Sequence, residues 1–219
     1  YCSLAINYLK LGYAWYIEGG KYYHHSQWMI RHYNTVIKKA AQHNLMVNIH
    51  EPIKPTGRSR TYPNAMTFEG LRGNEYNAWT GSNGNPPEHT TIIPFTRMLA
   101  GPIDFTPGIF ELKFDQYRPD QDPQTQRVNT TLAKQLALYI IIHSPLQMVA
   151  DLPENYKDNP AFEFIKQVPV SWDETRVIKS KIGDYVCIAR RKGEKWYVGS
   201  ITDEKPSEIK INLDFLGSD

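Results

Sequence analysis

The clearest pattern of apolar and polar positions lies over residues 26–43. Ser26 is a suitable N-cap and Asn44 a suitable stop, so the pattern predicts an amphipathic helix. A short apolar run of strand length, residues 45–50, follows at once and ends in ionisable residues. A helix followed by a buried strand with a polar tip is typical of a βα-barrel. The apolar positions with helical spacing are Trp28, Met29, Tyr33, Val36, Ile37, Ala40 and Ala41.

The same alternation recurs along the first three quarters of the chain. It predicts further strands at residues 13–17, 65–68 and 147–150, and a strong helix over residues 128–143. This gives roughly four or five strands, whereas a closed barrel of this type needs eight strands and about 250 residues. We therefore predict part of an α/β barrel of the TIM type. An open barrel leaves strand edges uncovered, so we expect further sequence upstream.

Past residue 168 the pattern changes to short alternating runs at residues 176–179, 185–190, 195–201 and 208–213. Turn residues such as Gly183 and Asp184 separate these runs. The tail therefore predicts a small antiparallel β domain.

Composition and charge exclude several classes of protein. Lys and Arg number 25 against 23 Asp and Glu, with both signs interleaved, so nothing indicates a nucleic-acid partner. The longest apolar run, residues 136–142, is too short for a membrane span, and the first residues do not resemble a signal peptide. Cys2 and Cys187 are too far apart in sequence for a metal motif and are interpreted as packed thiols.

Candidate chemistry is concentrated at the predicted strand ends. Glu51 follows His50, and Glu69 and Glu75 come soon after the strand predicted at residues 65–68. Parallel strands deliver their carboxyl ends to one rim of a barrel, so the three glutamates are expected to share a cleft. A pair of carboxyl groups suits glycoside hydrolysis, and a third could help to hold Ca²⁺. Any one of them could instead be an ordinary surface charge. The His-Glu-Pro order excludes a zincin helix, because Pro52 would break it.

These residues lie in segments that closely resemble glycoside hydrolase family 97. The resemblance is carried by residues 47–64, by Phe68-Glu69-Gly70 and Gly73-Asn74-Glu75-Tyr76, by residues 102–108, and in the tail by residues 188–191 and 196–199. The family has an N-terminal β-sandwich, a (β/α)₈ barrel and a C-terminal β domain. The resemblance therefore implies that residues 1–167 are the second half of the catalytic barrel and residues 168–219 the last domain.

The resemblance also implies roles for individual residues. Glu75 stands where the family has its general acid, and Glu51 where the inverting branch has one of its general bases. Glu51, Glu69 and Glu75 correspond to calcium ligands, and His50 and Arg60 are expected to contact an oligosaccharide substrate. The family's other base and one further calcium ligand would lie upstream of Tyr1, which leaves open whether this chain alone is active.

Two features favour an inverting α-glucosidase. Retaining members look like His-Gly-Pro where this chain has His50-Glu51-Pro52, and they carry an Asp nucleophile on an earlier strand, whose counterpart at residues 13–17 has none. Glu18 just beyond could be a displaced nucleophile, so a retaining α-galactosidase stays open.

A non-catalytic carbohydrate-binding protein is the third reading, with Tyr76 and Trp79 as aromatics that could stack on sugars. Family members are typically exported bacterial proteins, so the resemblance implies a periplasmic or extracellular location.

Overall fold

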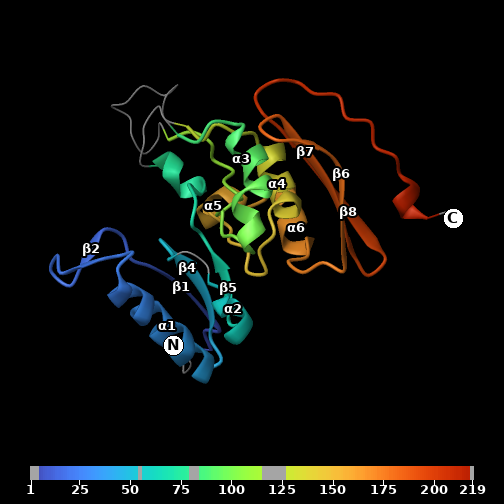
Figure 1. The fold of residues 1–219 in the computed structure, drawn as a ribbon. Coiled ribbons are helices and arrows are strands. Elements are labelled where there is room, and N and C mark those ends of the chain that lie inside the picture. Colours follow the sequence, from blue (N-terminus) through green and yellow to red (C-terminus); the bar gives the residue numbers. More distant parts are fainter. Residues whose placement is uncertain (1–4, 54–55, 79–83, 115–126, 218–219) are drawn as a thin grey trace.

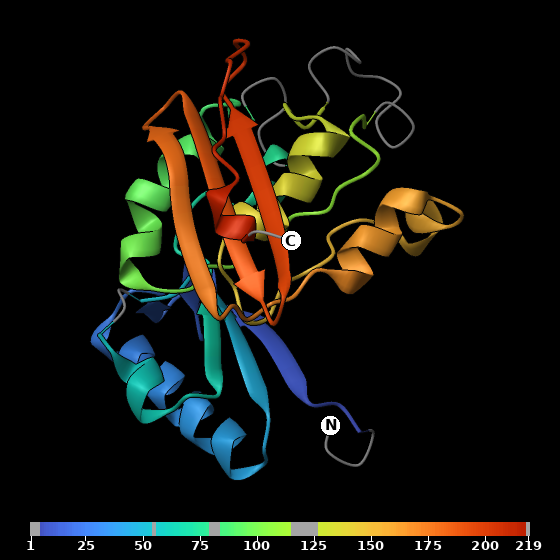
Figure 2. The ribbon, with the colours of Figure 1, turned by 90° about the vertical axis from the view of Figure 1, so that its right-hand side faces the viewer.

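The computed structural model describes residues 5–53, 56–78, 84–114 and 127–217. A parallel sheet is formed by β1 (Tyr8–Gly12), β4 (Met46–His50) and β5 (Ala65–Phe68), in that spatial order. Helix α1 (Gln27–Gln42) covers one face of this sheet (Figure 1). An antiparallel sheet of β6 (Glu174–Lys181), β7 (Tyr185–Lys192) and β8 (Lys195–Thr202) lies at the other end of the molecule (Figure 2). The fold thus mixes α/β layers with a small antiparallel sheet.

Helix α1 confirms the predicted helix. The Ser26 hydroxyl accepts a hydrogen bond from the backbone N–H of Met29, as an N-cap should. The helix buries one stripe of side chains. Complete burial of one large apolar side chain stabilises a fold by about 1.5–3 kcal/mol. The stripe and the strand residues it packs against are Met29, Tyr33, Ile37, Ala40, Val47, Ile49 and Ala65.

The strands predicted at residues 45–50 and 65–68 are confirmed as β4 and β5. Alternate residues of β4 face opposite ways, so Val47 and Ile49 pack with α1 while Asn48 and His50 reach Asp104. The parallel order continues beyond β5, because Phe68 bridges Ile103. One face of this sheet is therefore apolar and the other polar.

The strand predicted at residues 13–17 is wrong in position. The strand that pairs with β4 is β1, in a register that places Tyr8 beside Met46 and Gly12 beside His50. After Gly12 the chain leaves the sheet and forms a small hairpin of β2 (Tyr16–Ile17) and β3 (Tyr22–Tyr23). The turn that separates them from β1 passes through Trp15, whose φ of 61° cannot continue a strand.

Shorter elements connect the two sheets. The helix predicted at residues 128–143 is confirmed in part, since α4 (Leu132–Ile141) begins later, where the Thr131 hydroxyl caps it. The strand predicted at residues 147–150 is wrong: among the described residues this segment pairs with no strand, and its one hydrogen bond to another backbone runs from the Ala150 N–H to the Pro107 carbonyl oxygen. The remaining elements are α2 (Arg58–Thr61), η2 (Asn74–Ala78), α3 (His89–Ile92), η4 (Ile93–Phe95), η5 (Arg97–Ala100), α5 (Pro153–Tyr156) and α6 (Pro160–Gln167).

The antiparallel tail is confirmed for three of its four predicted strands. Residues 208–213 form no strand, because their backbone finds no ladder partner, and only the short η6 (Asp214–Leu216) follows. Cys187 is buried in β7 with a free thiol, as expected of a packed cysteine. Cys2 lies outside the described residues.

Helix α4 joins the antiparallel sheet to the rest of the chain. Its residues Leu138 and Ile141 share a core with Val186 and Ile201 of the sheet and with Ile103. The approach is close, because a Cβ added at Gly199 of β8 would lie 2.8 Å from the Ile140 Cβ. The predicted division at residue 168 therefore coincides with a change of architecture but not with a break in packing. Within the described part of the chain, no helix is both long and apolar enough to cross a bilayer.

Candidate active site

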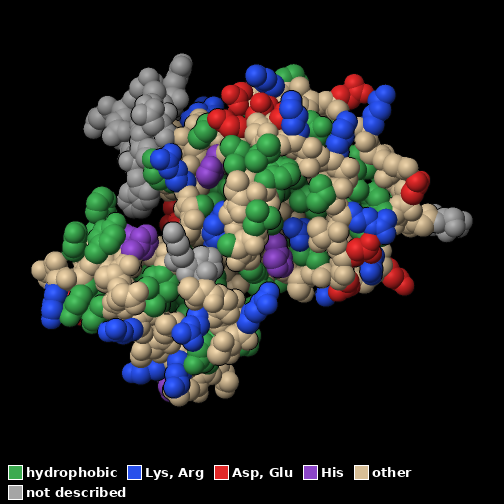
Figure 3. Space-filling model, in the orientation of Figure 1, with side chains coloured by type: hydrophobic (Ala, Val, Ile, Leu, Met, Phe, Trp, Pro, Cys, Tyr) green, Lys and Arg blue, Asp and Glu red, His purple; other side chains and the backbone are tan. Residues whose placement is uncertain are grey.

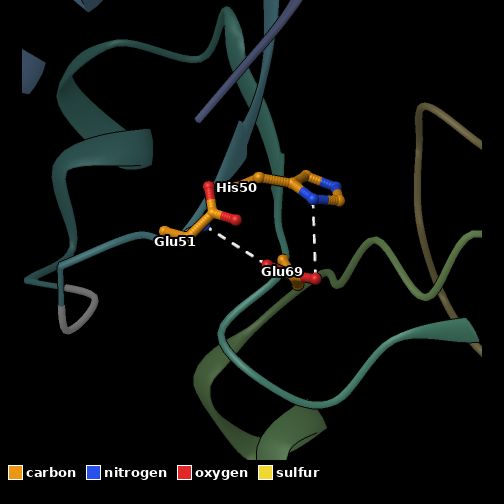
Figure 4. A group of neighbouring side chains, drawn as sticks. All are labelled: His50, Glu51 and Glu69. Atoms are coloured by element: carbon orange, nitrogen blue, oxygen red, sulfur yellow. Dashed lines mark hydrogen bonds and ion pairs between the residues drawn. The ribbon is translucent and has the colours of Figure 1, made fainter. Parts of the chain in front are cut away.

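Three of the predicted site residues meet at the carboxyl ends of β4 and β5. His50 is the last residue of β4, Glu51 follows it, and Glu69 follows β5 (Figure 4). Each offers a ligand atom within 4.8 Å of the others. The backbone N–H of Glu51 donates to Glu69 Oε2 at 3.3 Å, and His50 Nδ1 lies 3.5 Å from Glu69 Oε1. The expectation that strand ends bring the glutamates together is confirmed for Glu51 and Glu69, whereas Glu75 comes from η2.

The backbone makes specific room for Glu51. Its φ of 42° turns the chain out of β4, a conformation that a residue with a side chain rarely adopts. Opposite it, a Cβ at Gly12 would lie 2.2 Å from Glu51 Oε2. Only glycine in the neighbouring strand leaves space for the carboxylate. The Tyr33 hydroxyl fixes the same turn, 3.0 Å from the carbonyl oxygen of His50 and 3.1 Å from that of Glu51.

His50 is held by a fully buried carboxylate. Its Nε2 lies 2.6 Å from Asp104 Oδ2, and the Asn48 amide donates to the same oxygen at 2.5 Å. Burial opposes a charged imidazole, but the hydrogen bond to Asp104 and the charge of Glu69 outweigh it, so the pKa of His50 is raised. Burial would also raise the pKa of Asp104, yet its bonds from His50 and Asn48 hold that pKa below its ordinary value. The ring thus has a fixed orientation, with Nδ1 facing the glutamates.

Burial dominates at Glu69. It raises the pKa of the carboxyl group above its ordinary value, against the opposing effects of His50 and of the Glu51 backbone N–H. The neighbouring carboxylates of Glu51 and Glu75 act in the same direction as burial. A cation between these carboxylates would relieve that repulsion.

Glu75 reaches the cluster from η2. Its Oε2 lies 3.9 Å from His50 Nδ1, and its Oε1 accepts from Lys10 Nζ at 2.5 Å. Lys10 also lies 3.9 Å from Asp104, so this one cation connects two of the carboxylates. Glu75 is 40% exposed, whereas Glu69 is 15% exposed, and it is therefore the carboxyl group of this pair that a ligand entering from solvent meets first.

A cavity of 740 Å³ opens beside the cluster. Its volume is within the range of small-molecule sites. Glu51 and Glu69 line it together with His24 and His25 from the β2–β3 hairpin and Arg97 from η5.

Arg60 is the one predicted site residue that the structure keeps apart. It lies exposed on α2, which precedes β5 and so belongs to the opposite end of that strand from Glu69. It lines a different cavity of 480 Å³, over the apolar side of the sheet with Ile37 and Ile49. Strand direction explains the outcome, because a short helix before a strand and a loop after it end on opposite sides of the sheet.

Other candidates fall away from the cluster. Glu18 is exposed in the turn between β2 and β3 and does not line the 740 Å³ cavity. Tyr76 packs its ring under the Arg72 guanidinium at 4.6 Å. Trp79 lies outside the described residues.

Sequence reasoning missed Lys10 and Asp104. Asp104 lies within residues 102–108, and its place in Ile103-Asp104-Phe105 was a usable signal, because it resembles the polar–apolar alternation of β4. Lys10 was not recognised as a site residue, because the strand that carries it was predicted five residues too late in the chain. Both are inward-facing charged residues within strands or beside them, where burial makes a charge costly unless it is paired.

The cluster fits a hard cation. Ca²⁺ binds oxygen at about 2.3–2.6 Å, so two oxygens on opposite sides of one ion are at most about 5 Å apart. Glu51 and Glu69 offer oxygens within 4.8 Å of each other, and their crowding favours a positive charge between them. Glu75 is not part of this closest group, because Lys10 holds its carboxylate in this structure.

Comparison with known families gives two matches. A model described as "Glycoside hydrolase 97" matches residues 1–71, and one described as "Glycosyl-hydrolase 97 C-terminal, oligomerisation" matches residues 171–219. A retaining alpha-galactosidase of Bacteroides thetaiotaomicron is 39% identical over 180 residues, covering 81% of this chain and 27% of that protein. A probable retaining alpha-galactosidase of Streptomyces bingchenggensis is 36% identical over 176 residues, covering 80% of this chain and 25% of that protein. The chain thus spans about a quarter of the length of these relatives.

Solved structures agree with the family matches. A family 97 glycoside hydrolase from Pseudoalteromonas sp. strain K8, solved in complex with panose and with acarbose, superposes with a TM-score of 0.85 at 44% identity. That match covers 98% of this chain and 34% of the other. A beta-arabinopyranosidase superposes with a TM-score of 0.72 at 30% identity, covering 91% of this chain and 30% of the other.

Proposed function

The chain belongs to glycoside hydrolase family 97, and on that premise we propose that it is the C-terminal part of an enzyme that hydrolyses α-glucosidic bonds in oligosaccharides with inversion. The observation that carries the proposal is one oriented histidine surrounded by glutamates: Glu51 and Glu69 at the carboxyl ends of parallel strands, and Glu75 on η2. Inverting hydrolysis needs one carboxyl group to protonate the leaving oxygen and another to activate water.

In the proposed reaction Glu75 is the general acid. It is more exposed than Glu69 and Asp104 and has Lys10 beside it, so a sugar entering from solvent can reach both. Glu51, held in the strained turn after β4, contributes to the base on the opposite face of the sugar. His50, oriented by Asp104, has its Nδ1 3.5 Å from Glu69 and 3.9 Å from Glu75 and would hydrogen-bond a sugar hydroxyl. Together these groups orient the sugar and move two protons.

Calcium is part of the proposal. Glu51 and Glu69 would hold the ion, with Glu75 joining them when its carboxylate leaves Lys10. The bound ion would supply positive charge that fixes the carboxylates and orders the sugar. Removal of calcium by a chelator is then expected to abolish activity reversibly.

We further propose that residues 1–167 are the second half of a (β/α)₈ barrel whose first half lies upstream, in a periplasmic or extracellular enzyme. The spatial order β1, β4, β5, residue 103 and residue 143 supports this, because each segment hydrogen-bonds the next. The greater length of the relatives supports it as well. Experiments on function are therefore designed for the full-length protein.

A retaining α-galactosidase is the second candidate, and the names of the two curated relatives favour it. Two features of this chain favour inversion instead. By resemblance, retaining members have the order His-Gly-Pro, and Glu51 stands in place of that glycine. Strand β1, Tyr8–Gly12, contains no Asp that could act as a nucleophile. Proton NMR of the first sugar released separates the two, since inversion of an α-linkage gives the β-anomer and retention the α-anomer.

The test of the enzyme is cleavage of p-nitrophenyl α-glucoside and α-galactoside by full-length protein, with calcium and then with chelator. Glu75→Gln is expected to lower turnover of maltose by more than about 10²-fold, and that of the aryl glycoside less, because its leaving group needs protonation least. The matched control is Glu163→Gln, which changes an exposed glutamate of α6 that forms an ion pair with Lys166. Unchanged maltose turnover in Glu75→Gln contradicts the assignment, and oligosaccharide that binds but is never cut indicates a binding protein.

A further inference from the structure

The β2–β3 hairpin presents two different faces. The pairs Tyr16–Tyr23 and Ile17–Tyr22 lie opposite each other across the hairpin, so successive residues point to opposite sides. Ile17 packs against the core of α1, and the Tyr22 ring stacks on Trp28 of that helix at 4.3 Å and 4°. That face is anchored. The other face carries Tyr16, which is 63% exposed, and Tyr23, which is 40% exposed.

Trp15 comes directly before Tyr16 in the chain. It is 74% exposed and has a φ of 61°, which is unusual for a bulky residue. Its backbone is held in place by His24, whose backbone N–H donates to the Trp15 carbonyl oxygen at 2.8 Å. A strained, firmly held backbone that presents an indole to solvent indicates a use for that side chain.

The open face leads into the carboxylate cavity through a series of rings. Tyr16 and Tyr23 are 5.2 Å apart, Tyr23 and His24 4.4 Å, and His24 and His25 4.1 Å between ring centroids. His24 and His25 in turn line the 740 Å³ cavity together with Glu51. Figure 3 shows hydrophobic side chains gathered over this hairpin, with histidine between them and the body of the molecule.

We propose that Trp15, Tyr16 and Tyr23 form a sugar-stacking platform that binds the units of an oligosaccharide extending from the cleft toward solvent. Exposed apolar patches of this kind mark binding sites, and aromatic rings with polar edges suit a ligand whose faces are apolar and whose rim is hydroxylated. The occupant is identified by continuity, because the Tyr23 ring contacts the His24 ring, and His24 lines the same cavity as Glu51 and Glu69. This inference rests on the proposed function, since the platform extends that same site.

The platform predicts a dependence on substrate length. Single-sugar aryl glycosides are expected to occupy the cavity without reaching the platform, so Trp15→Asn and Tyr16→Thr should leave their kcat/KM within about twofold. For longer oligosaccharides, maltotriose and maltohexaose or their α-galactoside counterparts, kcat/KM is expected to fall about 3- to 10-fold per ring removed. Asn tolerates the left-handed backbone at position 15, and Thr suits the strand at position 16.

Tyr8→Thr in the full-length protein is the matched control. Tyr8 is 52% exposed in a strand, but it begins β1 and so lies at the end away from the carboxylates. This substitution should change kcat/KM for neither the short nor the long substrates. Equal loss on short and long substrates, or a drop in thermal midpoint with no length dependence, would overturn the platform and show that the face packs against another part of the protein. If the wild type cuts nothing, the proposed function fails. Calorimetric binding of maltohexaose to wild type and Tyr16→Thr then decides the platform, since equal affinities refute it.

Discussion

Replacing Gly12 with alanine tests the geometry of the site with one methyl group. Gly12 does not have the left-handed φ that excludes other residues, so its backbone accepts alanine. The new Cβ would lie 2.2 Å from Glu51 Oε2 and 2.8 Å from the His50 Cβ. Ordinary contact begins near 3.4 Å, so the carboxylate must move by about 1 Å or more.

A misplacement of this size has a calculable effect. Displacing a reacting group by about 1 Å can cost on the order of 10²-fold in rate, whereas overpacking at a single methyl costs about 1–3 kcal/mol of stability. We therefore expect Gly12→Ala to lower kcat by about 10²-fold and to lower the thermal midpoint only modestly. The assay is aryl glycoside hydrolysis by full-length protein at saturating calcium, with thermal unfolding measured on the same samples.

Glu51→Ala supplies the internal control. Once that carboxylate is gone, adding the methyl group at Gly12 should cost little further activity, so the two substitutions together should be far from additive. If Gly12→Ala keeps kcat within about threefold of wild type, Glu51 does not lie against Gly12 in the working enzyme and the proposed geometry is wrong.

Three further outcomes follow from contacts elsewhere. Asp104→Asn weakens the charge-assisted hydrogen bond that orients His50, so it is expected to lower kcat/KM about 10- to 100-fold. Circular dichroism should show that the fold is retained. Unchanged kinetics would contradict the role of Asp104. Burial lowers the pKa of Lys134 from 10.5 to about 8, so between these pH values the unfolded chain holds more protons. The stability of wild type relative to Lys134→Met, measured by denaturant unfolding, should therefore rise across that window, and a flat difference would refute the shift. Gly199→Val places a side chain against Ile140 and is expected to destabilise by about 1–3 kcal/mol, seen as a lower midpoint, with the control Val198→Thr near neutral.

The parts of the fold that could be predicted from sequence are those with strong local patterns. Helix α1 carries an N-cap and a regular apolar stripe, and β4 and β5 are short apolar runs with clear ends. The strand at β1 was misplaced because it is short and none of its residues is fully buried, while the aromatic residues 13–17 have higher β propensity. The segment at residues 208–213 has the pattern of a strand but no partner, and pairing is not a local property.

The candidate site divides in the same way. Glu51 and Glu69 could be placed together because strand direction alone brings their ends to one rim. Lys10 and Asp104 could not, because their contacts with Glu75 and His50 join residues 65 and 54 positions apart. Arg60 was expected at the site from a matching segment, but a segment that runs from one strand to the next passes both ends of the sheet.

Helix α4 has a consequence for how this protein can change over evolutionary time. One side of it supplies Gln135, whose Oε1 accepts hydrogen bonds from Asn74, the neighbour of Glu75, and from the backbone of Gly108. The other side supplies Ile140, which lies against Gly199 of β8. A single helix therefore contacts both the segment that carries Glu75 and the C-terminal sheet. Recombination that replaced the sheet alone would disturb the segment that carries Glu75. An exchange that keeps both intact must include α4, so the exchanged unit begins before α4 rather than at residue 168.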